Sequence, residues 1–147
     1  MSTLKDTLLT PEKRPRLVQD TAALVEREVS AKGGLSGIAI KTGYKAVKAL
    51  KPALIEEAID GLLDEFVVEL EPFHGEWESA GKSPGFDRYL EQRPQAVATA
   101  LLRVTDRRAL HVSHRTIKKT YDALRPHAEK NVIAAVPGLG RVLAQHL

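Results

Sequence analysis

The chain has 147 residues, of which 43% are hydrophobic and 28% charged, a composition typical of one soluble globular domain. It contains no cysteine, which excludes disulfide bonds and thiolate metal sites, and a net charge of +3 is too small to indicate nucleic acid or anionic lipid by itself. Because no apolar run could span a membrane and residues 1–10 lack the apolar region of a signal peptide, we expect a cytoplasmic protein with no transmembrane segment.

The first third of the sequence predicts helices that begin at capping residues and end at a glycine pair. Ser2 can cap a short first turn, and Thr10 followed by proline predicts the start of a longer helix. Apolar residues at helical spacing then continue to Val29, and Gly33-Gly34 predicts the end of that helix.

A lysine-striped helix is predicted over residues 38–51. Lys41, Lys45 and Lys48 are spaced i, i+4 and i+7, so they share one face. The opposite face is rich in small apolar residues around Gly43, which would let another helix approach closely.

A long acidic helix is predicted from Ala53 to Glu71, and Pro72 should end or kink it. Its apolar residues form a broad stripe, which predicts contact with more than one neighbour. Between Pro52 and Gly81 there are nine carboxylates and no Lys or Arg, whereas both flanking segments are basic. We favour neutralisation between these segments inside one fold; the alternative is a cationic face reserved for an anionic partner.

Proline and glycine divide the second half of the sequence. Residues 79–85 are the most loop-like stretch, and two lobes would meet there if the protein has them. The pattern beyond predicts a short helix ending before Pro94, one opened by Pro94, one from His114 to Leu124 capped by Ser113, and helical segments after Pro126 and Pro137. No segment alternates with a period of two. We therefore predict one all-α domain, residues 1–147, with seven or eight helices, several punctuated by proline.

Several short motifs are distributed along the chain: Gly34-Leu35-Ser36-Gly37, Tyr44-Lys45-Ala46-Val47-Lys48, Leu70-Glu71-Pro72-Phe73, Ala100-Leu101-Leu102 and Lys130-Asn131-Val132. With these motifs the sequence resembles an uncharacterised family of short bacterial proteins, a domain of unknown function. The resemblance spans nearly the whole chain and implies a single domain. It implies no activity, cofactor or catalytic residue.

The glycine turn and the lysine stripe form a candidate anion site. Backbone N–H groups at a helix start and nearby lysines attract phosphate, and the candidate residues are Gly34, Ser36, Gly37, Lys41, Lys45 and Lys48. The turn lacks the Gly-Lys-Ser/Thr ending of a P-loop and the second glycine of a nucleophile elbow, so the alternative is a structural helix junction.

The sequence contains only incomplete sets of possible metal ligands. The Glu71–His74 pair has the spacing of one half of a di-iron site, and the His111–His114 pair that of half a zinc site. Neither has the remaining ligands, so we expect no metal and no cofactor.

The sequence has many helix-packing signals and no convergent catalytic side chains, so we expect a non-enzymatic module for protein interaction or self-association. The alternative is an anion-binding module whose helix 38–51 contacts nucleic-acid phosphate or anionic lipid. A second basic cluster could extend that surface; it comprises Arg103, Arg107, Arg108, Arg115, Lys118 and Lys119. An enzyme using carboxylates of the acidic helix is the third hypothesis.

Overall fold

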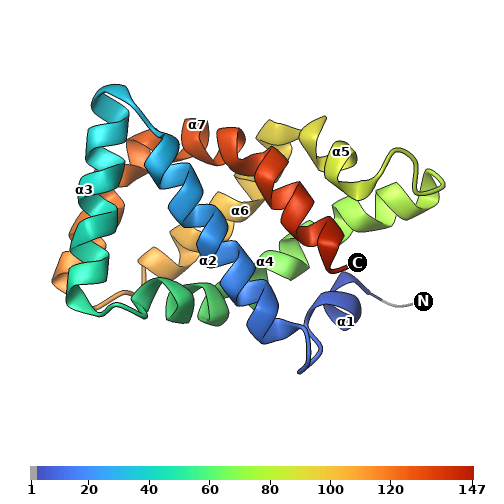
Figure 1. Cartoon of the computed structure of the whole chain (residues 1–147), viewed down its shortest axis with the longest axis horizontal. Helices are drawn as coiled ribbons and strands as arrows, with labels where there is room; N and C mark the ends of the chain where they lie inside the picture. The colour runs from blue at the N-terminus through green and yellow to red at the C-terminus, as the bar shows by residue number, and fades with distance from the viewer. Residues whose placement is uncertain (1–2) are drawn as a thin grey trace.

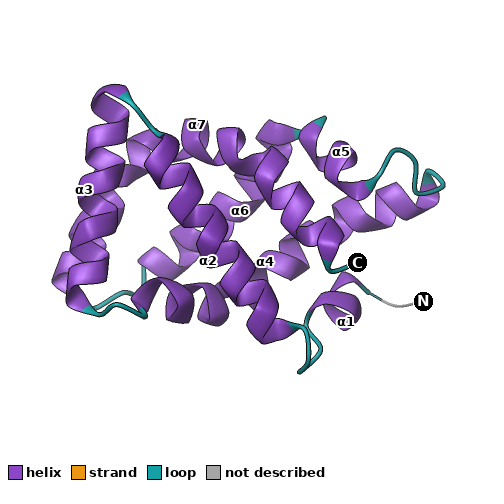
Figure 2. Cartoon of the chain, in the orientation of Figure 1, coloured by secondary structure: helices purple, strands orange, loops and turns teal. Residues whose placement is uncertain are grey.

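Seven α-helices form the described part of the chain (Figures 1 and 2). The computed structural model describes residues 3–147, apart from the side chains of Leu35 and Ser36. The helices are α1 (Leu4–Leu8), α2 (Arg14–Ala31), α3 (Gly34–Leu50), α4 (Leu54–Ser79), α5 (Phe86–Glu91), α6 (Pro94–Ala109) and α7 (Arg115–Gln145). No strand occurs among the described residues, which confirms the all-α prediction.

The N-terminus of α1 is capped by its own residues and is also hydrogen-bonded to the acidic helix α4. Thr3 forms a capping box with Asp6, whose backbone N–H donates to the threonine hydroxyl over 3.0 Å. The predicted cap, Ser2, lies outside the described residues. The Leu4 N–H donates to both carboxylate oxygens of Glu71, at 2.8 and 2.9 Å, so α4 supplies a further cap for α1.

Proline was the main source of error in the predicted helix ends. α4 continues through Pro72 to Ser79, and α7 contains both Pro126 and Pro137, so three predicted helices are one. The first residue of α7 is Arg115 and its N-cap is His114 instead of Ser113. A proline removes one helical hydrogen bond and bends the helix, but packing on both sides can keep the helix continuous. Figure 1 shows α7 changing direction as it passes from behind α3 to the C-terminus.

The predicted glycine turn belongs to α3. The helix begins at Gly34, with Gly33 as its N-cap, and Gly34 has a φ of +70°, which favours glycine. The close approach predicted at Gly43 is confirmed, and the approaching helix is α7 of the same chain. A Cβ at Gly43 would lie 2.9 Å from Leu124 Cδ1 and 3.1 Å from Thr120 Cγ2.

The hydrophobic core is not uniform along the molecule. The large, fully buried side chains come from α1, α2, α4, α5, α6 and the end of α7; they are Leu4, Leu8, Leu17, Val67, Leu70, Phe86, Leu90, Val97, Val104 and Val136. Among the described residues, α3 and the part of α7 before Val136 contribute no fully buried apolar side chain. The core is therefore closely packed around α1 and α5 and less so at the opposite end of the long axis, where α3 lies (Figure 1).

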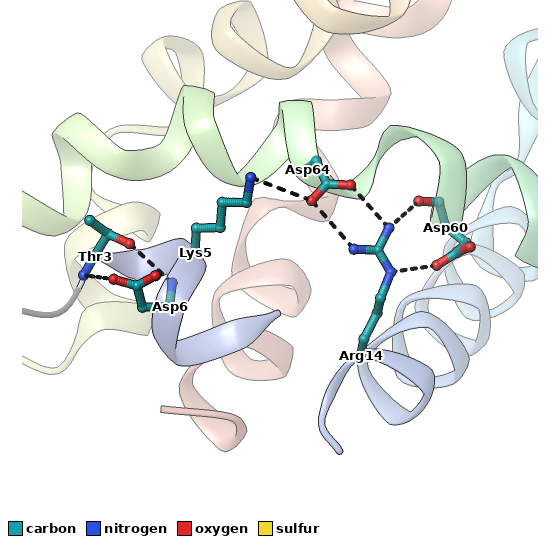
Figure 3. A network of polar contacts seen from close by, with 6 residues as sticks. All are labelled: Thr3, Lys5, Asp6, Arg14, Asp60 and Asp64. Carbon is teal, nitrogen blue, oxygen red and sulfur yellow. Dashed lines mark hydrogen bonds and ion pairs between the residues drawn. The ribbon is translucent and has the colours of Figure 1, made fainter. Parts of the chain in front are cut away.

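Basic side chains from before and after α4 neutralise its acidic face, as we predicted. Arg14 at the start of α2 binds Asp60 at 2.7 Å and Asp64 at 3.2 Å (Figure 3). It also donates to the Asp60 carbonyl at 2.7 Å. Lys5 approaches Asp64 from α1 at 3.9 Å.

The other side of α4 is neutralised by α6. Arg103 and Arg107 contact Glu69 at 2.9 and 3.3 Å, and Arg108 lies 3.8 Å from Glu65. The second basic cluster is thereby divided. In the described part of the chain its remaining members, Arg115, Lys118 and Lys119, form no ion pair.

The Arg14–Asp64 contact predicts a pH dependence of stability. Hydrogen bonds from Arg14 hold the pKa of Asp64 below its ordinary value of 3.8. Stability from this pair is then complete above pH 3.8 and is lost as the pH falls through the folded pKa. We expect urea unfolding to show Asp64→Asn less stable than the wild type near pH 6, with the difference shrinking below about pH 4.

The matched control is Glu26→Gln, because Glu26 is exposed and forms no ion pair with the described residues. Its difference from the wild type should not follow the Asp64 profile. A pH-independent penalty for Asp64→Asn would contradict the role given to Arg14.

Candidate apolar binding cavity

A cavity of about 490 Å³ lies between α2, α3, α4, α6 and α7. Its wall is predominantly aliphatic and includes Leu24, Val25, Val29, Ile40, Ile55, Ile59, Leu62, Phe66, Leu101, Leu124, Val132 and Leu139. This volume falls within the range of about 300–1,000 Å³ found for small-molecule sites. Such sites are also mostly apolar.

The broad apolar stripe of α4 explains how the cavity arises. Leu63 and Leu70 in this stripe are buried and also form part of the cavity wall. Ile55, Leu62 and Phe66 line the cavity as well and remain half-buried. The predicted contact with more than one neighbour is confirmed, because α4 packs against α1, α2 and α6, but these helices leave the half-buried residues facing the cavity.

The cavity wall offers little to water. Ordered water needs two to four polar partners, which aliphatic walls do not provide. The cavity is therefore chemically suited to an apolar molecule.

Polar side chains occupy a small part of the cavity wall. The titratable ones are Glu28 and Lys32 of α2 and His127 of α7. Lys32 Nζ lies 3.8 Å from Glu28 Oε1, and the two side chains are 18% and 29% exposed. Asn131 also lines the wall, and its side-chain amide donates to the His127 carbonyl at 2.6 Å.

A polar network beside the cavity joins α6 to α7. Arg125 binds Asp106 at 2.9 and 3.1 Å, and Tyr121 donates to the same carboxylate. The hydrogen bonds from Arg125 and Tyr121 lower the pKa of Asp106. Burial raises the pKa of Tyr121, and its hydrogen bond to Asp106 raises it further. The network fixes the α6 and α7 walls relative to one another.

The structure separates the predicted anion site from the cavity. Gly34 is exposed, but the Gly37 N–H donates to the Gly33 carbonyl at 3.1 Å, as a helical bond. A Cβ at Gly37 would lie 2.8 Å from the Lys32 carbonyl carbon, so that glycine permits a close backbone contact. The side chain of Ser36 lies outside the described residues.

The lysine stripe lies on the outer face of α3. Lys41, Lys45 and Lys48 are exposed, and in the described part of the chain none forms an ion pair. Lys48 Nζ lies 5.3 Å from the centre of the Tyr44 ring. Ile40, and none of these lysines, is among the side chains that line the cavity.

The residues of the two metal half-sites have other surroundings. Glu71 caps α1, while His74 is buried with its ring 5.5 Å from those of Trp77 and Phe86. His111 and His114 are exposed at the junction of α6 and α7. The described residues contain no group of three or more acidic or histidine side chains arranged around a metal position.

Comparison with protein families places the chain in a known family. The model of a family of unknown function, DUF6918, matches residues 4–147. The chain belongs to this family. The match confirms the resemblance seen in the sequence motifs, and no curated protein and no solved structure matches the chain. Within the described residues of this DUF6918 protein, no helix is both long and apolar enough to cross a membrane.

The contact at Gly37 tests whether this DUF6918 protein uses that glycine for packing. We expect Gly37→Ala to lower stability by about 1–3 kcal/mol, because the new Cβ meets the backbone of Lys32, which cannot rotate away. Gly61→Ala is the control, since its Cβ enters open space in α4 and should stabilise by up to about 1 kcal/mol. Equal effects of both changes in thermal unfolding would rule out the packing role.

Proposed function

We propose that this protein binds an apolar small molecule in the cavity between α2, α3, α4, α6 and α7. The observation that carries the proposal is a volume of about 490 Å³ walled by aliphatic side chains from five helices. Burial of apolar surface supplies about 25 cal/mol per Å², so such walls favour an apolar occupant without a dedicated polar contact.

The position of α3 supports a route for entry. Its apolar side chains are at most half-buried where they are described, and Ile40 forms part of the cavity wall. Elements with few buried contacts open at the lowest free-energy cost. The cavity is already partly open to solvent, and movement of α3 away from α7 at the Gly43–Leu124 contact would widen it while leaving the core around α1 and α5 intact.

The proposal predicts binding of a neutral apolar dye. We expect N-phenyl-1-naphthylamine to gain fluorescence with the wild type at a stoichiometry near one. Ala135 lines the cavity, so Ala135→Phe should weaken dye binding at least tenfold by occupying its space, with stability unchanged or raised.

The matched control is Val68→Phe, which adds the same side chain on α4 at a position that is 58% exposed and outside the cavity wall. Dye binding should persist in this variant. Equal dye binding by all three proteins would place the dye on the outer surface and reject the cavity as its site.

Self-association or binding of a protein partner is a second proposal. The sequence argued for it from the small face around Gly43, but α7 of the same chain covers that face. Its remaining support is the exposure of large apolar side chains, with Leu110 79% and Ile38 63% exposed. Light scattering of the purified protein tests self-association, and a monomer at high concentration would exclude it.

Anion binding by α3 is a third proposal, supported by one contrast. Arginines beside α4 are paired with carboxylates, whereas Lys41, Lys45 and Lys48 are exposed without an ion pair in the described part of the chain. Such a lysine face would bind nucleic-acid phosphate or anionic lipid through charge, with a strong dependence on salt.

Replacing Lys41, Lys45 and Lys48 together by Gln should then abolish retention on a polyanion column without changing helicity. The control replaces Arg16, Arg88 and Lys130 by Gln, which removes the same charge from exposed positions on three other helices. If both triple variants elute together, net charge alone explains retention and the α3 face has no special role.

A further inference from the structure

One helix, α3, joins the apolar cavity to a cationic surface. Its Ile40 lines the cavity, and its outer face carries Lys41, Lys45 and Lys48. We propose that this lysine face docks on an anionic lipid bilayer and that the cavity takes its apolar ligand from that bilayer. The inference rests on the proposed function, since it names the source of the ligand for that same cavity.

The charge of α3 favours an anionic partner. The helix contains three lysines and no acidic residue. All three lysines are exposed, and none forms an ion pair with the residues that the structure describes. A lysine close to an anionic bilayer surface strengthens binding about fivefold, so three of them strengthen it roughly a hundredfold.

An exposed apolar side chain lies on the same face of α3. Ile38 is 63% exposed, and it precedes Lys41 and Lys45 by three and seven residues, which is the spacing of one helix face. Helices that lie in a bilayer interface combine these two kinds of side chain, because the ammonium groups contact lipid headgroups while the apolar group enters the acyl boundary. The lysine face therefore suits a lipid surface.

The cavity favours a bilayer over nucleic acid, the other partner rich in phosphate. Its wall is predominantly aliphatic, so its proposed ligand is a molecule whose transfer into water is unfavourable. Such a molecule is concentrated in the hydrocarbon interior of a bilayer, whereas nucleic acid provides no such reservoir. The face also lacks the Arg, Asn and Gln side chains that commonly read base edges.

The attachment of α3 to the rest of the molecule is weak enough to couple docking to the cavity. Where its side chains are described, no apolar one is fully buried. Its ion pair with α4 joins Lys51 to Glu57, whose side chains are 58% and 50% exposed. Because elements with few buried contacts shift at low cost, contact with a bilayer at the α3 end of the molecule (Figure 1) would widen the cavity.

The first test is sedimentation with vesicles of phosphatidylcholine alone and with vesicles that also contain phosphatidylglycerol. Two triple variants are compared: the α3 variant replaces Lys41, Lys45 and Lys48 by Gln, and the control variant replaces Arg16, Arg88 and Lys130 by Gln. At low salt the wild type and the control variant should sediment with the anionic vesicles. The α3 variant should bind them roughly a hundredfold more weakly.

The second test follows loading of the cavity with radiolabelled dodecane dissolved in the same vesicles. After incubation, high salt releases the protein, the vesicles are sedimented, and the label that remains with the protein is counted. Because docking raises the local concentration of protein at the bilayer, the wild type should load at least about tenfold faster from anionic than from neutral vesicles. The α3 variant should load equally slowly from both. Without vesicles, all three proteins should bind N-phenyl-1-naphthylamine alike, which shows that each is folded with its cavity intact.

The outcomes separate the two proposals. If the wild type binds the dye but does not sediment with anionic vesicles, or if both triple variants sediment equally well, docking through α3 is wrong while the cavity stands. Retention of the wild type on immobilised DNA without such sedimentation would assign the lysine face to nucleic acid instead. Sedimentation without faster loading would overturn the bilayer as the source of the ligand. If neither the dye nor dodecane binds, the proposed function fails, and the bilayer source fails with it.

Discussion

The fold depends on neutralising one acidic helix from two sides. Like charges along α4 repel one another unless cations oppose them, and those cations come from segments on either side of it in the sequence. Arg14 reaches α4 from α2, and Arg103 and Arg107 reach it from α6. Each exposed pair is worth only about 0–1 kcal/mol, but together they specify which helices lie beside α4.

This charge pattern also explains why the core is unequal. Arginines of α2 and α6 form ion pairs with α4. Among the described residues, the only ion pair between α3 and α4 joins Lys51, the C-cap of α3, to Glu57 at 2.7 Å. Gly43 instead brings α3 against Leu124 of α7. A helix held close to α7 and tied to α4 only at its end leaves the apolar face of α4 partly uncovered.

The sequence predicted which faces are apolar but not the distance between them. Periodicity correctly gave the stripes of α3 and α4, because side-chain direction follows from 3.6 residues per turn. It placed boundaries at Pro126 and Pro137, where tertiary packing keeps α7 continuous. The cavity had only one sequence signal, the unusual width of the α4 stripe. The sequence pattern of an apolar helix face does not depend on how closely the neighbouring helix packs against it. The pattern therefore predicted buried core positions for Ile55 and Phe66, which instead line a cavity.

If the cavity binds a ligand as we propose, binding and folding are aspects of one process. A molecule that binds only the folded chain stabilises it by an amount that grows with the ligand concentration relative to its dissociation constant. Here the same molecule would contact Ile40 of α3, Phe66 of α4 and Leu124 of α7, joining helices that otherwise share few buried contacts. An occupant would thus complete the core at the α3 end of the molecule, where the chain's own side chains do not.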